Sequence, residues 1–378
     1  MSTRSMSNKK ASNKKVRYAV VGLGHIAQVA VLPAFRSAGN SELRSVVSSD
    51  EEKRAKVTRQ YRLKESYSYD QYEQALENVD AVYIALPNHL HREYTVRAAK
   101  AGKHVLCEKP MAVTEDECEA MIDAARSHAV KLMIAYRLHF ERGNLEAVKL
   151  AHNGTIGEAR FFSSEFAQQV AEDNVRVTEP VEKGGGPVYD MGVYCINAAR
   201  YLFQAEPTHL LATSATSRDD ARFDKTNEMT SAILRFPEER LATFTCSFGA
   251  ADVSRYTVAG TKGILAVDPA YEYSTGVKHQ LTKNGKTKKE SFPKRDQFAA
   301  EIVYFSDCVL KNKEPEPSGL EGLADVKIVR AIYESARRGS AVELSGMPAK
   351  KKPAAHQEIH RPAHGKPETH KVKSASGE

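Results

Sequence analysis

The stretch that decides the fold reads VRYAVVGLGHIA and spans residues 16–27. Its first six residues are mostly apolar and predict a buried strand, and a Gly-x-Gly-x-x-Ala pattern follows that strand directly. Glycines in such a turn let the backbone approach a pyrophosphate, and the helix that begins there offers unpaired N–H groups and positive potential. We therefore predict a dinucleotide-binding turn that consists of Gly22, Gly24, His25, Ile26 and Ala27.

Strands and helices alternate from this turn to residue 136. The expected strands lie at 43–48, 81–86, 105–108 and 131–135, and the expected helices lie at 26–38, 51–61, 91–101 and 114–125. Thr114 and Glu117 form a capping box at the start of the last of these helices. This order is typical of a doubly wound parallel sheet, so residues 16–136 are expected to form an α/β domain of the Rossmann type.

The pattern changes after residue 136, where strands follow one another without intervening helices. The expected strands lie at 158–166, 209–217, 230–236 and 241–248, and in the run 255–267, where a turn at 260–263 separates strands at 256–259 and 264–267. Helices are expected at 143–152, 296–310 and 319–338. Such strands pair antiparallel and can leave one face of the sheet free. Residues 137–346 are therefore expected to form an α+β domain with a mostly antiparallel, open sheet for substrate binding and oligomerisation.

The two ends of the chain differ from its body. Residues 1–15 lack periodicity and residues 347–378 are rich in Pro, Lys and His, so we expect a disordered arm and a disordered basic tail. The net charge of +7 is concentrated there, because residues 1–17 carry six Lys or Arg and no acid, and the tail carries seven against three Glu. The remaining body is mildly acidic, which argues against a nucleic-acid partner.

Composition also bears on location and on metal binding. The five cysteines contain no CxxC pair and three lie in apolar runs, which indicates free thiols in a reducing compartment. No apolar stretch is long enough to span a membrane, and the basic N-terminal stretch lacks the apolar segment of a secretory signal. No HExxH motif or Cys/His cluster lies on an expected element. We expect a cytoplasmic protein without a metal.

The end of the second strand bears on which dinucleotide binds. NAD sites usually place Asp or Glu there to accept from the ribose hydroxyls. This chain has Ser48 at that position and Lys53 five residues later, and a hydroxyl with an ammonium suits a 2′-phosphate. Asp50 favours NAD, and Lys53 could be a solvated helix residue. We expect NADP, with NAD as the less favoured alternative.

Three further segments concentrate polar and glycine residues. LPNHLH at 86–91 and CEKP at 107–110 each follow a strand of the parallel sheet, and GGGPVYDMGVYCIN spans residues 184–197. The first two lie at the carboxyl edge of the sheet, where ligands of such sheets bind. In the third, a helix that begins near Val188 places Asp190 and Tyr194 on one face.

These motifs resemble those of the Gfo/Idh/MocA oxidoreductases, and within them the glucose–fructose oxidoreductase branch. The resemblance covers residues 16 to about 345 and rests on GLGHIA, LPNHLH, AGKHVLCEKPM, GGG…D-x-G-x-Y and SRYTVAG…VDPAYEY. It implies a C-terminal sheet that often forms an interface, and thus a homo-oligomer, a dimer or a tetramer. It also implies hydride transfer between a C–H of a sugar or polyol and the nicotinamide.

The resemblance implies roles for single residues. Lys109 matches the lysine of the E-K-P motif, which contacts the reacting hydroxyl, and Tyr194 matches the acid/base tyrosine of the branch. Asp190 matches the aspartate beside that group, so these three residues are the expected catalytic set. Tyr136 and Arg137 match a Tyr-Arg pair that is expected to face the substrate together with Asp190 and Tyr194.

The cofactor contacts follow in the same way. Asn88 matches a residue near the nicotinamide, and Ser48 and Lys53 match contacts to the 2′-phosphate. The edge segments add further expected cofactor contacts, which are Pro87, His91, Glu108 and Lys109.

Alcohol oxidation requires that a proton leaves as the hydride leaves. Close to a positive nicotinamide ring, Lys109 would have a lowered pKa and could share this proton with Tyr194. Each residue also has a plainer interpretation. Lys109 could be a surface lysine before a turn-forming proline, Tyr194 could serve packing, and Asp190 could stabilise a first helical turn.

The chain departs from its relatives in ways that limit the prediction. Inositol dehydrogenases carry a histidine and a further acid where this chain has Tyr194 and Asn197, which disfavours cyclitols. Glucose–fructose oxidoreductases carry a twin-arginine signal, absent here, and a tryptophan that matches residues 174–178, NVRVT in a chain without Trp. We predict an NADP-dependent oxidoreductase of a sugar or polyol, with a glucose-like pyranose favoured. The alternative is a non-catalytic NADP-binding regulator on the same fold.

Overall fold

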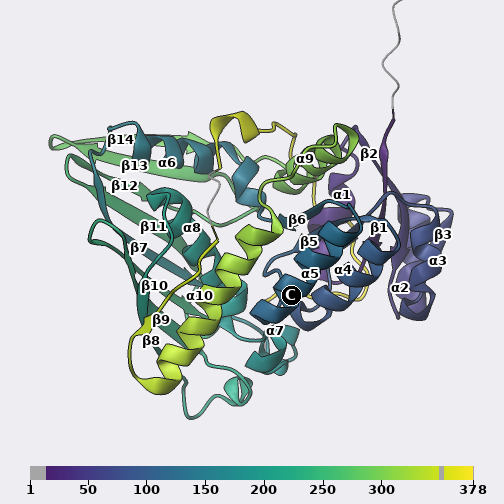
Figure 1. The fold of residues 1–378 in the computed structure, drawn as a ribbon, viewed down its shortest axis with the longest axis horizontal. Coiled ribbons are helices and arrows are strands. Elements are labelled where there is room, and N and C mark those ends of the chain that lie inside the picture. Colours follow the sequence, from purple (N-terminus) through teal and green to yellow (C-terminus); the bar gives the residue numbers. More distant parts are fainter. Residues whose placement is uncertain (1–13, 349–352, 378) are drawn as a thin grey trace, which may run out of the picture.

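The computed structural model describes residues 14–348 and 353–377. These residues form two lobes, each built on one sheet, with helices gathered on the sheet faces and between the lobes (Figure 1). Most of the N-terminal arm predicted to be disordered lies outside the described residues. In the part of the chain that is described, no helix is long and apolar enough to cross a membrane.

The first lobe holds a six-stranded parallel sheet in the order β3-β2-β1-β4-β5-β6. Its strands are β1 (Val16–Val21), β2 (Ser41–Val47), β3 (Glu65–Tyr67), β4 (Ala81–Ile84), β5 (His104–Glu108) and β6 (Leu132–Ala135). The strand order reverses between β1 and β4. Ligands of open α/β sheets bind at such a switch point, beyond the carboxyl ends of the strands.

The regular helices of this lobe are α2 (Glu51–Tyr61), α3 (Tyr72–Glu77), α4 (His91–Lys100) and α5 (Glu115–Ser127), and the capping box of Thr114 and Glu117 is present on α5. Three of them match predicted helices, whereas α3 and strand β3 were not predicted. The predicted helix at 26–38 is instead a π-helical turn (Ala27–Val31) followed by the short α1 (Leu32–Ala34). Pro33 has no N–H for the usual ladder, which explains the irregular path.

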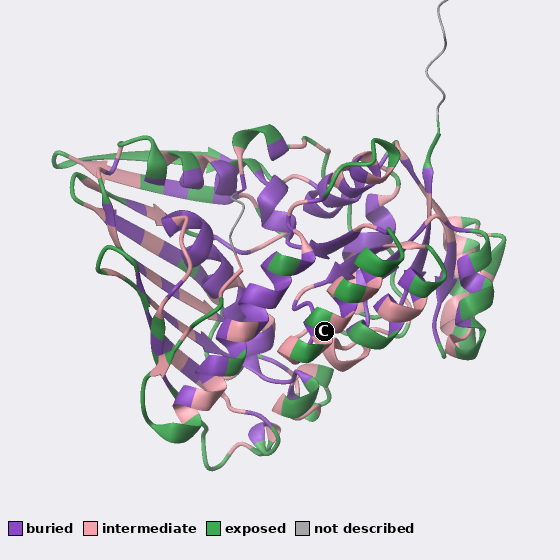
Figure 2. Cartoon of the chain, in the orientation of Figure 1, coloured by how far each residue is buried: buried purple, intermediate pink, exposed green. Residues whose placement is uncertain are grey.

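The second lobe holds a nine-stranded sheet in the order β14-β13-β12-β11-β7-β10-β9-β8-β15, antiparallel apart from the parallel pair of β7 and β10. Its strands are β7 (Ala159–Ala167), β8 (His209–Ala215), β9 (Met229–Phe236), β10 (Arg240–Ser247), β11 (Val253–Gly260), β12 (Gly263–Val267), β13 (Val277–Lys283), β14 (Lys286–Phe292) and β15 (Val342–Glu343). One face is covered by α6 (Arg142–His152), α8 (Val193–Phe203) and α10 (Gly319–Arg338). Figure 2 shows buried residues along the strands beneath these helices.

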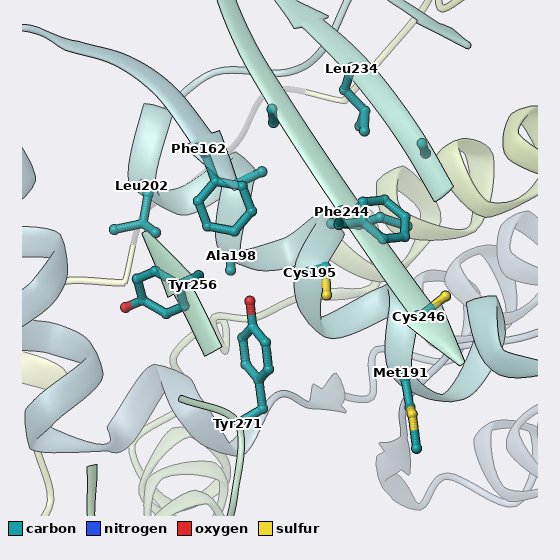
Figure 3. Packing of buried hydrophobic residues seen from close by; sticks show 14 of the residues in the cluster. Phe162, Met191, Cys195, Ala198, Leu202, Leu234, Phe244, Cys246, Tyr256 and Tyr271 are labelled. Carbon is teal, nitrogen blue, oxygen red and sulfur yellow. The ribbon is translucent and has the colours of Figure 1, made fainter. Parts of the chain in front are cut away.

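The core of the second lobe fixes helix α8. Cys195 and Ala198 on α8 lie among aromatic side chains, including Phe162 and Phe244 of the sheet and Tyr271 of the segment between β12 and β13 (Figure 3). Since α8 is held along its buried face, its first turn is set at a defined place beside the first lobe.

All five cysteines are buried and free.

Two segments cross back to the first lobe. Helix α9 (Gln297–Leu310), which we predicted as part of the second domain, packs with Phe298 and Ile302 against the core beneath β1. The tail predicted to be disordered has a described path over residues 353–377, with little regular structure. Its main-chain N–H and C=O groups are hydrogen-bonded to both lobes, which the composition of the tail did not indicate.

Candidate active site

The glycine turn after β1 fits a dinucleotide pyrophosphate. Gly22 has a φ of +96°, and a Cβ there would lie 2.3 Å from the carbonyl oxygen of Ala85. A Cβ on Gly24 would meet no atom within 4 Å, so its backbone faces open space. His25 and Ile26 are half-buried in the turn, while Ala27 is buried. The turn thus combines a required glycine with room for a ligand to approach the backbone.

The end of β2 shows how its polar residues are used. The side chain of Asp50 caps α2 by accepting the N–H of Lys53 at 2.8 Å. Ser48 is buried, and its carbonyl oxygen accepts from the guanidinium of Arg54. The Lys53 side chain is half-buried beside them. Asp50 is therefore engaged as a helix cap, which weakens the case that it serves as the ribose-binding acid of an NAD site.

Lys109 and Asp190 bring the two lobes together. Lys109 follows β5, and its Nζ donates to both the Oδ1 and the main-chain oxygen of Asp190, each at 3.0 Å. Asp190 lies in the π-helical turn Val188–Gly192 that leads into α8. The other carboxylate oxygen, Oδ2, is 2.6 Å from the Nε of Arg176. One carboxylate thus holds two cations at the carboxyl edge of the parallel sheet.

The charges in this cluster fix the protonation of its members. Burial disfavours a charged Asp190, but Arg176 and Lys109 outweigh burial and lower the pKa of Asp190 to about 2. Burial would lower the pKa of Lys109, yet Asp190, with help from Tyr194 and Glu108, raises it above the ordinary value. We predicted a lowered pKa beside a nicotinamide ring, and the chain's own residues act in the opposite direction.

Tyr194 lies between two cations. The Nζ of Lys109 is 4.8 Å from its ring centroid, and its hydroxyl accepts from Arg137 Nη2 at 3.1 Å. Arg137 is itself buried, and its guanidinium stands over the ring of Tyr273. The structure thus brings Lys109, Asp190, Tyr194 and Arg137 into one cluster, as the sequence predicts.

Asn88 joins the first lobe to the glycine run of the second. Its Nδ2 donates to the carbonyl oxygen of Gly184 at 2.7 Å. Gly184 has a φ of +83°, and a Cβ there would lie 2.7 Å from the Cβ of Asn88. Pro87, the residue before Asn88, is half-buried at the same edge. This close approach places the loop after β4 directly against the segment that carries Asp190.

Two of the predicted contact residues do not face the cluster. His91 is fully buried, and its ring nitrogens lie 2.9 Å from the carbonyl oxygens of Leu86 and Pro110. It therefore ties the two edge loops together rather than offering a nitrogen to a cofactor. Tyr136 stacks on His139, and burial with the nearby Asp325 raises its pKa well above the usual value. Its hydroxyl points into the core, so its expected contact with substrate is not supported.

Glu108 belongs to a buried carboxyl pair behind Lys109. The hydroxyl of Tyr83 lies 2.8 Å from Glu108 Oε1 and 2.9 Å from Glu301 Oε1. A hydroxyl has one hydrogen, so both bonds form only when at least one carboxyl is protonated. Burial raises the pKa of both acids, that of Glu301 well above the usual value. The Glu108 side chain thus supports the strand end that carries Lys109, and the expected contact of this residue with the cofactor stays a prediction.

Arg176 is a site residue that sequence reasoning missed. It precedes the glycine run, within the stretch where the related branch has a tryptophan, and that departure was the available signal. Besides its pair with Asp190, its charge helps burial to lower the pKa of His25 in the glycine turn. Arg176 therefore lies close to both the nucleotide turn and the Lys109 cluster.

No group of three metal-ligating side chains occurs in the described part of the chain.

Comparison with known sequences places this cluster in a family. Residues 16–136 match a model described as "Oxidoreductase family, NAD-binding Rossmann fold", and residues 144–266 match the GFO/IDH/MocA C-terminal domain. The chain belongs to the Gfo/Idh/MocA oxidoreductase family. It is an NAD(P)-dependent oxidoreductase, and the resemblance found in its motifs is confirmed.

Individual members of the family are similar over most of the chain. The D-xylose 1-dehydrogenase [NADP(+)] of Haloarcula marismortui is 33% identical over 88% of this chain and 94% of its own. A crystal structure of the aldose-aldose oxidoreductase from Caulobacter crescentus, complexed with glycerol, is 38% identical with a TM-score of 0.83 and covers 88% of this chain and 100% of its own. The 3-ketoreductase KijD10 from Actinomadura kijaniata, with NADP and TDP-benzene, is 26% identical with a TM-score of 0.77, and the match covers 85% and 98% of the two chains.

Proposed function

We propose that this protein transfers a hydride between a sugar or polyol, with a glucose-like pyranose favoured, and NADP. The observation that carries the proposal is the cluster of Lys109, Tyr194 and Asp190 at the carboxyl edge of the parallel sheet. This cluster lies on the same sheet edge as a glycine turn with room for a pyrophosphate. A phenol and an ammonium side by side suit proton transfer to or from a hydroxyl.

The chain's own residues account for the proton. When bound, NADP accepts or returns a hydride at its nicotinamide ring. In the oxidative direction, the phenolate form of Tyr194 takes the hydroxyl proton and becomes the neutral phenol. The guanidinium of Arg137, which donates to the Tyr194 oxygen, stabilises the phenolate before the transfer. Lys109 donates to the substrate oxygen and orients it, while Asp190 keeps the ammonium in place.

NADP rather than NAD is proposed for two reasons. The end of β2 offers Ser48 and Lys53 at the positions expected to meet a 2′-phosphate, and its nearest acid, Asp50, caps a helix. NADP also appears in the names of the xylose dehydrogenase and the KijD10 complex. A sugar substrate is inferred from the same relatives and from the aldose-aldose oxidoreductase.

The proposal is tested by turnover of the full chain with NADP and a panel of D-glucose, D-xylose, glycerol and myo-inositol. We expect reduced nicotinamide to form with at least one pyranose and not with myo-inositol. The KM for NAD should be higher than the KM for NADP. If none of these alcohols reduces NADP, and no related aldose or keto sugar consumes NADPH, the proposal is wrong.

We also propose that the open face of the large sheet forms a homo-oligomer interface, giving a dimer or a tetramer. Large apolar side chains on this face are 45–51% exposed, and they come from five strands, namely Phe161, Leu211, Ile233, Leu241 and Ile264. Exposed apolar patches of this kind mark contact surfaces. Light scattering of the purified chain tests this, and a monomer at micromolar concentration would refute it.

The free thiols support a reducing location for this function. All five cysteines are buried without a disulfide, and burial raises the pKa of Cys118 and the other thiols. We therefore propose the cytoplasm, and localisation of a tagged full chain tests it.

A further inference from the structure

The C-terminal tail crosses the cofactor side of the molecule. Residues 368–371 lie against α2 and the start of the helix after the glycine turn, and residues 373–375 reach the second lobe. There, the carbonyl oxygen of Ala375 accepts the N–H of Ala171, beside α7 (Val175–Thr178). The tail therefore spans the two lobes close to the residues that are expected to hold a dinucleotide.

Two glutamines fix the tail in this place. The Gln28 side chain, 2% exposed, accepts the N–H of His370 at 2.7 Å and donates to its carbonyl oxygen at 3.0 Å. Gln60 donates to the carbonyl oxygen of Glu368 and lies 3.0 Å from the His370 ring nitrogen. Paired main-chain bonds to a buried amide set the register of the segment, since a buried amide left without partners is costly.

This register aims Lys371 at the end of β2. Lys371 has a φ of 50°, a conformation that side-chain-bearing residues seldom adopt. Its Nζ lies 2.5 Å from Glu52 Oε2 and 3.7 Å from Asp50 Oδ2. The tail thus turns at Lys371 and sets a cation between Asp50, the N-cap of α2, and Glu52 in the first turn of that helix.

The charge balance there bears on cofactor choice. Lys56 also pairs with Glu52, at 2.7 Å, and offsets part of the negative charge in either case. Without Lys371, Asp50 would have no such partner among the described residues, and the two acids would make the charge beside Ser48 and Lys53 more negative, where a 2′-phosphate is expected. Such charges repel a phosphate and favour the neutral ribose hydroxyls of NAD. With Lys371 paired to both acids, the local charge becomes compatible with the phosphate.

We propose that Lys371, supplied by the C-terminal tail, is a specificity-determining residue that favours NADP over NAD. The inference rests on the proposed function, because it presumes that the turn after β1 binds a dinucleotide. It assigns the tail to the cofactor site of its own chain. It also explains how an NADP site can retain Asp50 near its 2′-phosphate position.

The test is a titration of the full chain with NADPH and with NADH, without any sugar, followed by fluorescence of the reduced nicotinamide. The absence of Trp leaves this signal clear. The variants are Lys371→Met, Lys371→Glu and the control Lys373→Met, which removes the same charge from the same tail. Lys373 pairs instead with Asp173 at 2.6 Å. Thermal melting checks that each variant is folded.

We expect Lys371→Met to raise the Kd of NADPH about tenfold, as expected for the loss of one partly screened charge interaction, and to leave that of NADH within about twofold. Lys371→Glu should raise the Kd of NADPH further. Lys373→Met should keep the wild-type ratio of the NADPH and NADH dissociation constants. A chain that ends at residue 352 should lose the preference as Lys371→Met does.

Three results would overturn the inference. The first is a ratio of NADPH to NADH affinity that does not change in either Lys371 variant. The second is a truncated chain that binds both cofactors equally more tightly, which would make the tail a blocking segment. The third is a wild-type chain that binds neither cofactor. This result refutes the proposed function as well, whereas the first two refute only the role of Lys371, so the two failures can be told apart.

Discussion

Lys109 and Asp190 form the contact on which the active cluster depends: one ammonium donates to the side-chain oxygen and to the main-chain oxygen of the same residue, each at 3.0 Å. Lys109 comes from the end of a parallel strand, and Asp190 comes from the turn before a helix of the other lobe. The contact therefore orients a charged side chain and also fixes the two lobes relative to each other.

Replacing Asp190 with Asn should change the pH dependence of turnover. Asp190 raises the pKa of Lys109 against the effect of burial, so removal of its charge should lower that pKa, and Arg176 left nearby should lower it further. In the pH profile of kcat/KM, the fall at high pH reports the loss of the proton of Lys109. We expect this fall to move to lower pH in Asp190→Asn and kcat to decrease. A pH profile of Asp190→Asn that overlays the wild-type profile would contradict this expectation. Asp190→Glu, which keeps the negative charge, should have a profile closer to that of the wild type.

Removing the hydroxyl of Tyr194 should reduce turnover without loss of cofactor binding. Tyr194→Phe keeps the ring beside Lys109 but leaves no oxygen to move the proton, and Arg137 loses one acceptor. We expect kcat to fall about 10²-fold or more. The measurement is kcat with the active sugar, alongside the Kd of NADPH. Full activity in this variant would show that another group moves the proton.

The buried pair of Glu108 and Glu301 should make stability depend on pH. Burial raises the pKa of Glu301 well above its value in the unfolded chain, so its native form holds a proton that the unfolded form releases. The contribution of Glu301 to stability is then greatest below the unfolded-state pKa of about 4 and falls as pH rises towards the folded-state value. Glu301→Gln, which carries no titrating proton, should remove this decline.

Melting temperatures across the pH range check this expectation. Between the folded-state and unfolded-state pKa values of Glu301, the free energy of unfolding of Glu301→Gln should gain about 1.4 kcal/mol over that of the wild type for each pH unit. The melting temperatures of the two proteins should diverge accordingly. Parallel curves for the two proteins would show that the pair does not hold a proton. Tyr83→Phe, which removes the hydroxyl between the acids, provides a second probe of the same site.

The open sheet face should tolerate charge poorly if it forms the interface. Ile233→Glu places a carboxylate among exposed apolar side chains, and we expect it to shift the oligomer towards the monomer at micromolar concentration. Leu320→Glu on α10 is a matched control, because Leu320 and Ile233 are equally exposed at 47%. Light scattering of both variants distinguishes them. An unchanged mass for Ile233→Glu would place the interface elsewhere.

The sequence predicted most of the parallel sheet and the site cluster. Strand β1 and its glycine turn are local features, because an apolar run and two glycines define them without help from distant residues. The α5 capping box is local in the same sense. Lys109 and Tyr194 were predicted because their motifs are short and distinctive, and the fold places the Lys109 Nζ 4.8 Å from the centroid of the Tyr194 ring.

Other features depend on distant partners and escaped prediction. His91 lies in an edge motif, yet only the positions of Leu86 and Pro110 show that its ring ties two loops together. Tyr136 precedes a site arginine, but its ring belongs to the core and its hydroxyl is buried. The tail has the composition of a disordered segment, and its place is set by Gln28, which is more than 300 residues away. Sequence patterns contain no signal for such contacts.

The most direct test of the account is turnover of Lys109→Met with saturating NADP and the active sugar, compared with the wild type and with Lys100→Met, a lysine replaced on the exposed surface of α4. We predict that kcat falls by about 10²- to 10⁴-fold in Lys109→Met while NADPH still binds, and that Lys100→Met behaves as the wild type does. Undiminished turnover in Lys109→Met, or loss of NADPH binding in that variant, would contradict the assignment of Lys109 to the reacting hydroxyl.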